Sequence, residues 1–67
     1  MKTGRIKWFN DHENYGYIVL KDGTEVYFHG TGLMRTGLSL NPGTDVSFDL
    51  METRSGPEAH NVEPIGF

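Results

Sequence analysis

The stretch NYGYIVLKDGTEVYFHG, residues 14–30, contains two short runs in which aromatic and aliphatic residues alternate on either side of one turn. Alternation with a period of two is typical of a strand with one buried and one exposed face. Ile18 and Leu20 share one side of the first run, and Val26 and Phe28 share one side of the second. We therefore predict a β-hairpin whose aliphatic side chains enter a core and whose tyrosines point outward.

The register of this hairpin follows from parity. Directly opposed residues of an antiparallel pair point to the same face, and the predicted core residues all have even numbers, so paired positions must sum to an even number. A three-residue loop, residues 21–23, satisfies this rule and pairs Ile18 with Val26. It also places Gly23 where such a loop needs a left-handed backbone. The same register gathers four ring-bearing side chains on the outer face as opposed pairs: Tyr17 with Tyr27, and Tyr15 with His29.

The rest of the chain predicts three further strands. Residues 5–7 alternate cation and aliphatic, residues 46–50 alternate apolar and polar, and residues 59–62 form a last short strand before Pro64. Five short strands at even spacing indicate a small barrel or sandwich. We favour a closed barrel, because closure removes sheet edges that so short a chain cannot cover. The expected fold class is all-β, with residues 1–67 as a single domain.

Residues 30–43 fit neither a strand nor a tight turn. A segment of about fourteen residues is at the upper limit for an unstructured loop in a compact domain. We expect apolar side chains to hold parts of it to the barrel: Leu33, Met34, Leu38 and Leu40.

The composition restricts the class of protein. The chain has 67 residues, no cysteine and a formal net charge of −3, which leaves room for one core and excludes disulfides and thiolate metal sites. No apolar run approaches the ~18 residues of a membrane-spanning helix, and the N-terminus lacks a signal-peptide pattern, so we expect a cytoplasmic protein. Although the chain is acidic, the charged side chains that precede Asp11 are all cations: Lys2, Arg5 and Lys7.

The outward rings have two explanations. Aromatic residues suit strands, and cross-strand aromatic pairs stabilise sheets. A patch of this size is, however, costly to expose without a use. Flat rings beside Arg5 and Lys7 are suited to single-stranded nucleic acid, because bases stack on rings while cations hold phosphates. We therefore predict a binding face that contains five rings: Trp8, Tyr15, Tyr17, Tyr27 and His29.

Three motifs carry a family resemblance. The segments KWFN at residues 7–10, YGYI at 15–18 and VYFHG at 26–30 resemble those of the cold-shock domain. The resemblance extends over nearly the whole chain, through AHNV at residues 59–62. It implies a five-stranded antiparallel barrel of the oligonucleotide/oligosaccharide-binding (OB) type. It also implies that the protein binds single-stranded RNA and DNA with little sequence preference, as an RNA chaperone linked to low temperature or stress.

The resemblance also assigns binding residues by position. Strict alternation from Ile6 would turn Trp8 inward and Phe9 outward, whereas the resemblance requires Trp8 outward, and a β-bulge near Lys7 would reconcile the two. Arg54 is expected to contact phosphate at the rim. The residues that match the family are Lys7, Trp8, Phe9, Tyr15, Tyr17, Tyr27 and His29.

The chain departs from the family at three places. Gly30 stands where the family usually has an aromatic residue after the histidine. Leu38 stands where the family usually has a second aromatic residue, and we include Leu38 in the predicted binding set. Glu13 and Asn14 replace a lysine and a glycine, although asparagine also supplies a left-handed turn. Two rings and one cation of the usual site are therefore missing.

Other chemistries have weaker support. His12, His29 and His60 are far apart in sequence and have no cysteine partners, so we expect no metal site and no cofactor. The chain has no nucleophile in a recognisable setting and no phosphate-binding loop, so we expect no enzymatic activity. A protein-interaction module on the same barrel remains the alternative function. We expect a monomer, with a strand-exchanged dimer hinged at residues 30–43 as the alternative.

Overall fold

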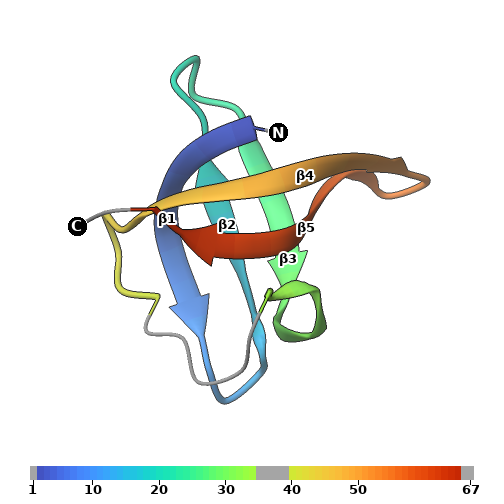
Figure 1. Cartoon of the computed structure of the whole chain (residues 1–67). Helices are drawn as coiled ribbons and strands as arrows, with labels where there is room; N and C mark the ends of the chain where they lie inside the picture. Colours follow the sequence, from blue (N-terminus) through green and yellow to red (C-terminus); the bar gives the residue numbers. More distant parts are fainter. Residues whose placement is uncertain (1, 35–39, 66–67) are drawn as a thin grey trace.

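The computed structural model describes residues 2–34 and 40–65. They form a closed barrel with the strand order β1-β2-β3-β5-β4 (Figure 1), which confirms the predicted all-β barrel of five strands. Among the described residues, no helix has the length and apolar composition needed to cross a membrane. The elements are β1 (Lys2–Asn10), β2 (Tyr15–Val19), β3 (Glu25–His29), the 3₁₀ turn η1 (Gly30–Gly32), β4 (Asp45–Thr53) and β5 (Gly56–Pro64).

The seam that closes the barrel differs from the others. Strand β1 pairs antiparallel with β2 and β4, as do β2 with β3 and β4 with β5. The seam between β3 and β5 is parallel and short, with Tyr27 opposite Glu58 and Phe28 opposite Ala59. Strand β5 is also longer than predicted, since it begins at Gly56 rather than at residue 59. Its added residues pair with the end of β4 and extend that hairpin beyond the barrel wall, as Figure 1 shows.

The β2–β3 hairpin has the predicted register, with Ile18 opposite Val26. Gly23 adopts a φ of 90°, the left-handed conformation that the three-residue loop requires. The Asp22 carboxylate accepts a hydrogen bond from the Thr24 backbone N–H at 2.9 Å. This bond to the Thr24 backbone, followed by one to its side chain, lowers the pKa of Asp22 from its ordinary value.

A β-bulge in β1 decides which rings face outward. Ile6 lies opposite Ile18, but Trp8 lies opposite Tyr17, so Lys7 is the extra residue. This confirms the bulge predicted near Lys7. Since opposed residues share a face, Trp8 joins Tyr17 on the outer side. Phe9 turns to the other face, where it packs against the core.

The core fills the barrel with side chains from all five strands and from the segment that precedes β4. Leu40 is 6% exposed within it, and Leu33 packs against it from a bridge to Val62. The prediction for Met34 was wrong: its backbone N–H bonds to the Val62 carbonyl, but its side chain is 52% exposed. Leu38 lies outside the described residues. The buried core residues are Ile6, Ile18, Val26, Phe28, Leu40, Val46, Phe48, Ala59 and Val62.

Candidate nucleic-acid interface

Four rings from three neighbouring strands contact one another in a closed cycle, which we call the aromatic platform: Trp8, Tyr15, Tyr27 and Tyr17. Trp8 lies 5.2 Å from Tyr15 and 5.4 Å from Tyr17, measured between ring centroids. Tyr27 lies 5.9 Å from both tyrosines. The contacts are edge-on or tilted, which are favourable geometries for aromatic pairs. Each ring is therefore held by two others and remains partly exposed.

The β-strand register explains why these four rings meet. Tyr17 and Tyr27 are directly opposed in the β2–β3 hairpin, and the bulge places Trp8 opposite Tyr17 on the other edge of β2. Tyr15 lies two residues before Tyr17 and so points to the same face. Strand β2 thus forms the middle of the platform.

His29 lies at the end of the platform, opposite Tyr15. Its Nδ1 accepts a hydrogen bond from the Thr31 backbone N–H at 3.2 Å and lies 3.0 Å from the Thr31 hydroxyl. Because Nδ1 accepts, the neutral ring carries its proton on Nε2. The η1 turn therefore fixes the orientation of this ring.

Two of the predicted phosphate-binding cations, Arg5 and Lys7, form ion pairs. Lys7 Nζ lies 2.6 Å from a Glu25 carboxylate oxygen, and Arg5 Nε lies 3.1 Å from one of Asp45. Sequence reasoning missed both carboxylates: Arg5 is directly opposed to Asp45 in the β1–β4 pairing, which the alternation within either strand does not reveal. Such exposed pairs contribute little to stability, so a phosphate competes with them at modest cost.

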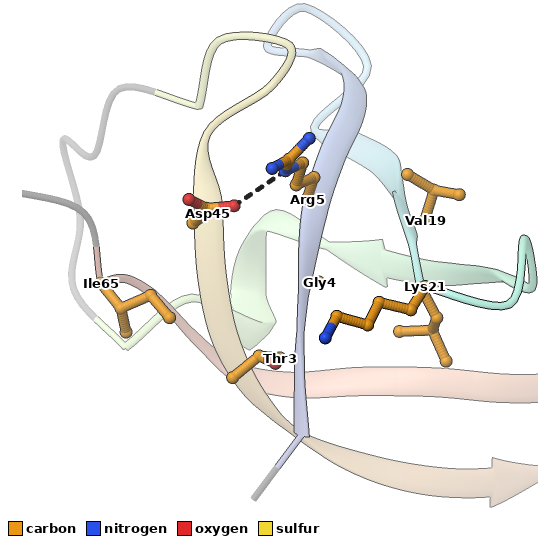
Figure 2. Close-up of a pocket in the computed structure, with 8 residues that line it drawn as sticks. Thr3, Gly4, Arg5, Val19, Lys21, Asp45 and Ile65 are labelled. Carbon is orange, nitrogen blue, oxygen red and sulfur yellow. Dashed lines mark hydrogen bonds and ion pairs between the residues drawn. The ribbon is translucent and has the colours of Figure 1, made fainter.

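Arg5 lies in a different hollow from the platform. Figure 2 shows its ion pair with Asp45, which joins β1 to the neighbouring strand β4. None of the four platform rings lines this cavity of about 510 Å³. Its walls are formed by Thr3, Gly4, Arg5, Val19, Leu20, Lys21, Asp45 and Ile65.

A second hollow adjoins the platform directly. Tyr17 and Tyr27 form one wall of a cavity of about 430 Å³. The other wall is the turn between β4 and β5, which carries the exposed Arg54. The remaining lining residues are Thr53, Ser55, Gly56, Pro57 and Glu58. The predicted rim position of Arg54 thus lies in the turn that borders the rings.

The turn between β1 and β2 approaches the opposite end of the platform. Asn10 Oδ1 accepts hydrogen bonds from the backbone N–H groups of His12 and Glu13, at 2.9 and 3.0 Å. Asn14 follows with a φ of 64°, the left-handed conformation expected of it. Its carbonyl accepts a hydrogen bond from the Gly30 N–H at 2.8 Å. Within residues 2–34 and 40–65, no three acidic or histidine side chains gather in a metal-binding group.

Among the described residues, the predicted binding residues Arg5 and Phe9 are not brought onto the platform. The Phe9 ring stacks on Phe28, with centroids 5.5 Å apart and an interplanar angle of 13°, and is half-buried. Leu38 lies outside the described residues. The platform with its rim therefore contains Lys7, Trp8, Tyr15, Tyr17, Tyr27, His29 and Arg54.

Comparisons with known proteins agree with this geometry. A family model described as the 'Cold-shock' DNA-binding domain matches residues 2–65. The chain is 40% identical over 63 residues to the cold shock protein CspB of Geobacillus stearothermophilus, covering 92% of this chain and 96% of that protein. The same figures hold for the cold shock protein CspD of Bacillus subtilis.

Among solved structures, the chain resembles one described as drosophila Unr CSD456, with a TM-score of 0.75 and 17% identity. The match covers 97% of this chain and 26% of the other. At this identity the similarity shows the fold alone.

Proposed function

The chain belongs to the cold-shock domain family, and from this premise we propose how its own residues bind a single strand. It binds single-stranded nucleic acid and has the RNA-chaperone-like function of cold shock proteins. The observation that carries the proposal is the closed cycle of four rings on the outer face of β1, β2 and β3.

The platform holds bases by stacking. Successive bases of an unpaired strand lie on the rings of Trp8, Tyr15, Tyr17 and Tyr27, and each stacked base contributes about 1–3 kcal/mol. Because every base has a flat face, such contacts tolerate most sequences. A chaperone needs this tolerance, since it must hold many transcripts unpaired.

Charge has a secondary role in this proposal. Lys7 reaches a phosphate only when it leaves Glu25, and Arg54 contributes from the rim. The formal net charge of −3 further weakens the attraction to a polyanion. Stacking is therefore the main source of affinity.

Several finer points belong to the same proposal. We propose that residues 1–67 act as one domain, that the protein is a monomer in the cytoplasm, and that it works without catalysis or a cofactor. The family membership supports this view, since a passive stacking surface performs the chaperone function without chemistry.

Fluorescence of Trp8 tests the binding mode. Pyrimidine-rich single strands of about six to eight nucleotides should quench it, since barrels of this kind occupy ~4–16 nucleotides. A duplex of the same sequence should quench far less, because its bases are already stacked on each other. Equal quenching by both, or by neither, would exclude the stacking mode.

A protein-interaction role is the second candidate. The observation in its favour is that Lys7 and Arg5 are each neutralised by a carboxylate. If no single strand quenches Trp8 under low salt, where electrostatic attraction is strongest, this second role takes the place of the first.

A further inference from the structure

The amide of Asn14 occupies a position at the end of the aromatic platform that a side chain at position 30, the first residue of η1, could not share. A Cβ added to Gly30 would overlap the Oδ1 and Cγ atoms of Asn14 and lie 2.6 Å from its Nδ2. The asparagine amide therefore lies over the bare backbone of Gly30. The glycine and the amide together form one structural unit.

The backbone holds this amide in place. The Asn14 N–H donates to the Asn10 carbonyl at 2.7 Å, and the Asn14 carbonyl accepts from the Gly30 N–H at 2.8 Å. The left-handed φ of 64° fixes the direction in which the side chain leaves. The amide is therefore preorganised, and ordering it on binding costs little.

The amide is also available to a ligand. Asn14 is exposed, and within residues 2–34 and 40–65 its side chain forms none of the hydrogen bonds found. Asn61, the other asparagine with a positive φ, differs because its amide donates to Asp49 at 2.9 Å. An unpaired amide held beside stacking rings presents a donor and an acceptor side by side.

Asn14 and Gly30 flank the last opposed pair of the platform, Tyr15 and His29. An unpaired base stacked at this end has no partner strand, so its hydrogen-bonding edge is free to contact polar protein groups beside the rings. Such groups can distinguish one base from another. An amide matches adenine through two hydrogen bonds, to N6 and N7. A stacking ring at position 30 would hold any base there, whereas an amide selects among bases.

We propose that Asn14 is a base-reading residue that gives the Tyr15 end of the platform a preference for adenine through its N6 and N7 edge. This inference rests on the proposed function, because it requires a strand on the platform. It adds selectivity to a surface whose other contacts are indifferent to sequence.

The test compares short homopolymers. Titrations of Trp8 fluorescence with oligo-dA and oligo-dT of about six nucleotides give the affinity ratio in the wild type and in Asn14→Gly. Glycine keeps the left-handed backbone and removes only the amide. We expect the substitution to lower the dA-to-dT affinity ratio by about tenfold, the scale of one good bidentate contact.

Two further variants make the test specific. Asn14→Asp keeps the size and the backbone conformation but cannot donate to N7, so it should lose the adenine preference as well. Asn61→Gly is the matched control, because it removes an amide from another left-handed position and should leave the ratio unchanged. Replacing adenine by 7-deazaadenine, which lacks N7, should weaken binding to the wild type and leave Asn14→Gly unaffected.

The outcomes separate the two proposals. If the wild type binds no single strand, the proposed function itself fails. If it binds, but Asn14→Gly leaves the dA-to-dT ratio unchanged or 7-deazaadenine binds as tightly as adenine, only the base-reading role of Asn14 is overturned.

Discussion

The side-chain amide of Asn14 fills the space above Gly30 that a side chain at position 30 would need. The two residues are also joined through their backbones by a hydrogen bond of 2.8 Å. Positions 14 and 30, where the resemblance predicts two separate departures from the family pattern, are therefore one coupled feature. Asn14 is therefore not expected to tolerate an aromatic side chain at position 30 unless its amide moves away.

This coupling predicts non-additive substitutions. Gly30→Phe alone should lower the melting temperature, because the Asn14 amide must be displaced. The double variant Asn14→Gly/Gly30→Phe should recover the melting temperature and bind single strands more tightly, by up to ~1–3 kcal/mol for the added stacking ring. Thermal unfolding and Trp8 titrations of both variants check this, with Asn14→Gly as the control. Equal destabilisation in the single and double variants would contradict it.

The second prediction concerns stacking. Tyr17→Ala or Tyr27→Ala should each weaken single-strand binding by about 1–3 kcal/mol, because each removes one ring of the platform. The controls Tyr17→Phe and Tyr27→Phe keep the ring and should bind nearly as the wild type does. Titration of Trp8 fluorescence measures all four. Alanine variants that bind normally would show that affinity does not come from these rings.

The third prediction uses the ion pair between Lys7 and Glu25. The wild-type slope of log affinity against log salt should be no steeper than about −3, because few cations reach phosphate. Glu25→Gln frees Lys7, so it should tighten binding at low salt and steepen the slope by up to ~0.7. Titrations between about 50 and 200 mM salt measure the change.

Asp45→Asn is the matched control for this experiment, since it removes the same charge and frees Arg5 beside a separate hollow. We expect it to leave the slope as in the wild type. An equal change in both variants would mean that overall charge, rather than the position of Lys7, controls binding.

The fourth prediction concerns the close approach of β1 and β2. A Cβ at Gly16 would overlap the Trp8 carbonyl oxygen and lie 2.9 Å from the Phe9 Cα. Both neighbours are backbone atoms, so Gly16→Ala should destabilise the barrel by about 1–3 kcal/mol. Chemical denaturation measures this loss. The exposed substitution Glu52→Ala should stay within about 0.5 kcal/mol of the wild type, and a similarly stable Gly16→Ala would show that the strands can separate here.

The fifth prediction concerns the pH dependence of the β2–β3 turn. The pKa of Asp22 lies below its ordinary value of 3.8 in the folded protein, so its carboxylate favours folding above that pH. Asp22→Ala should therefore lower the melting temperature at neutral pH. This difference should shrink as the pH falls through the pKa of the folded protein. Asp22→Asn keeps an acceptor for Thr24 and should show a smaller, pH-independent effect, measured by thermal unfolding across acidic pH.

Parity and turn chemistry were sufficient to predict much of the platform. The alternation of Tyr17 with Ile18 and the left-handed Gly23 determine the hairpin register, because one face must be buried. The bulge at Lys7 was predicted only through the family resemblance, since strict alternation would have turned Trp8 inward. Local sequence patterns therefore specify the β2–β3 hairpin but not the β-bulge in the neighbouring strand β1.

Other features depend on contacts between distant segments. The pair between Arg5 and Asp45 joins residues that are far apart in sequence, and alternation within one strand carries no information about its neighbour. The position of Asn14 over Gly30 likewise depends on how two turns meet. Neither contact can be inferred from the residues of one strand or one turn alone.

The bulge at Lys7 makes the length of β1 as important as its composition. Deletion of Lys7 would restore regular pairing and leave the orientation of the residues that follow unchanged, because Trp8 would stay opposite Tyr17. If β1 instead kept Lys7 and paired without the bulge, Trp8 would enter the core and Phe9 would face outward, although every side chain would still be present. The single extra residue in β1 therefore lets the strand present both Lys7 and Trp8 on its outer side, and a frame-preserving loss of its codon would remove the cation while leaving the ring in place.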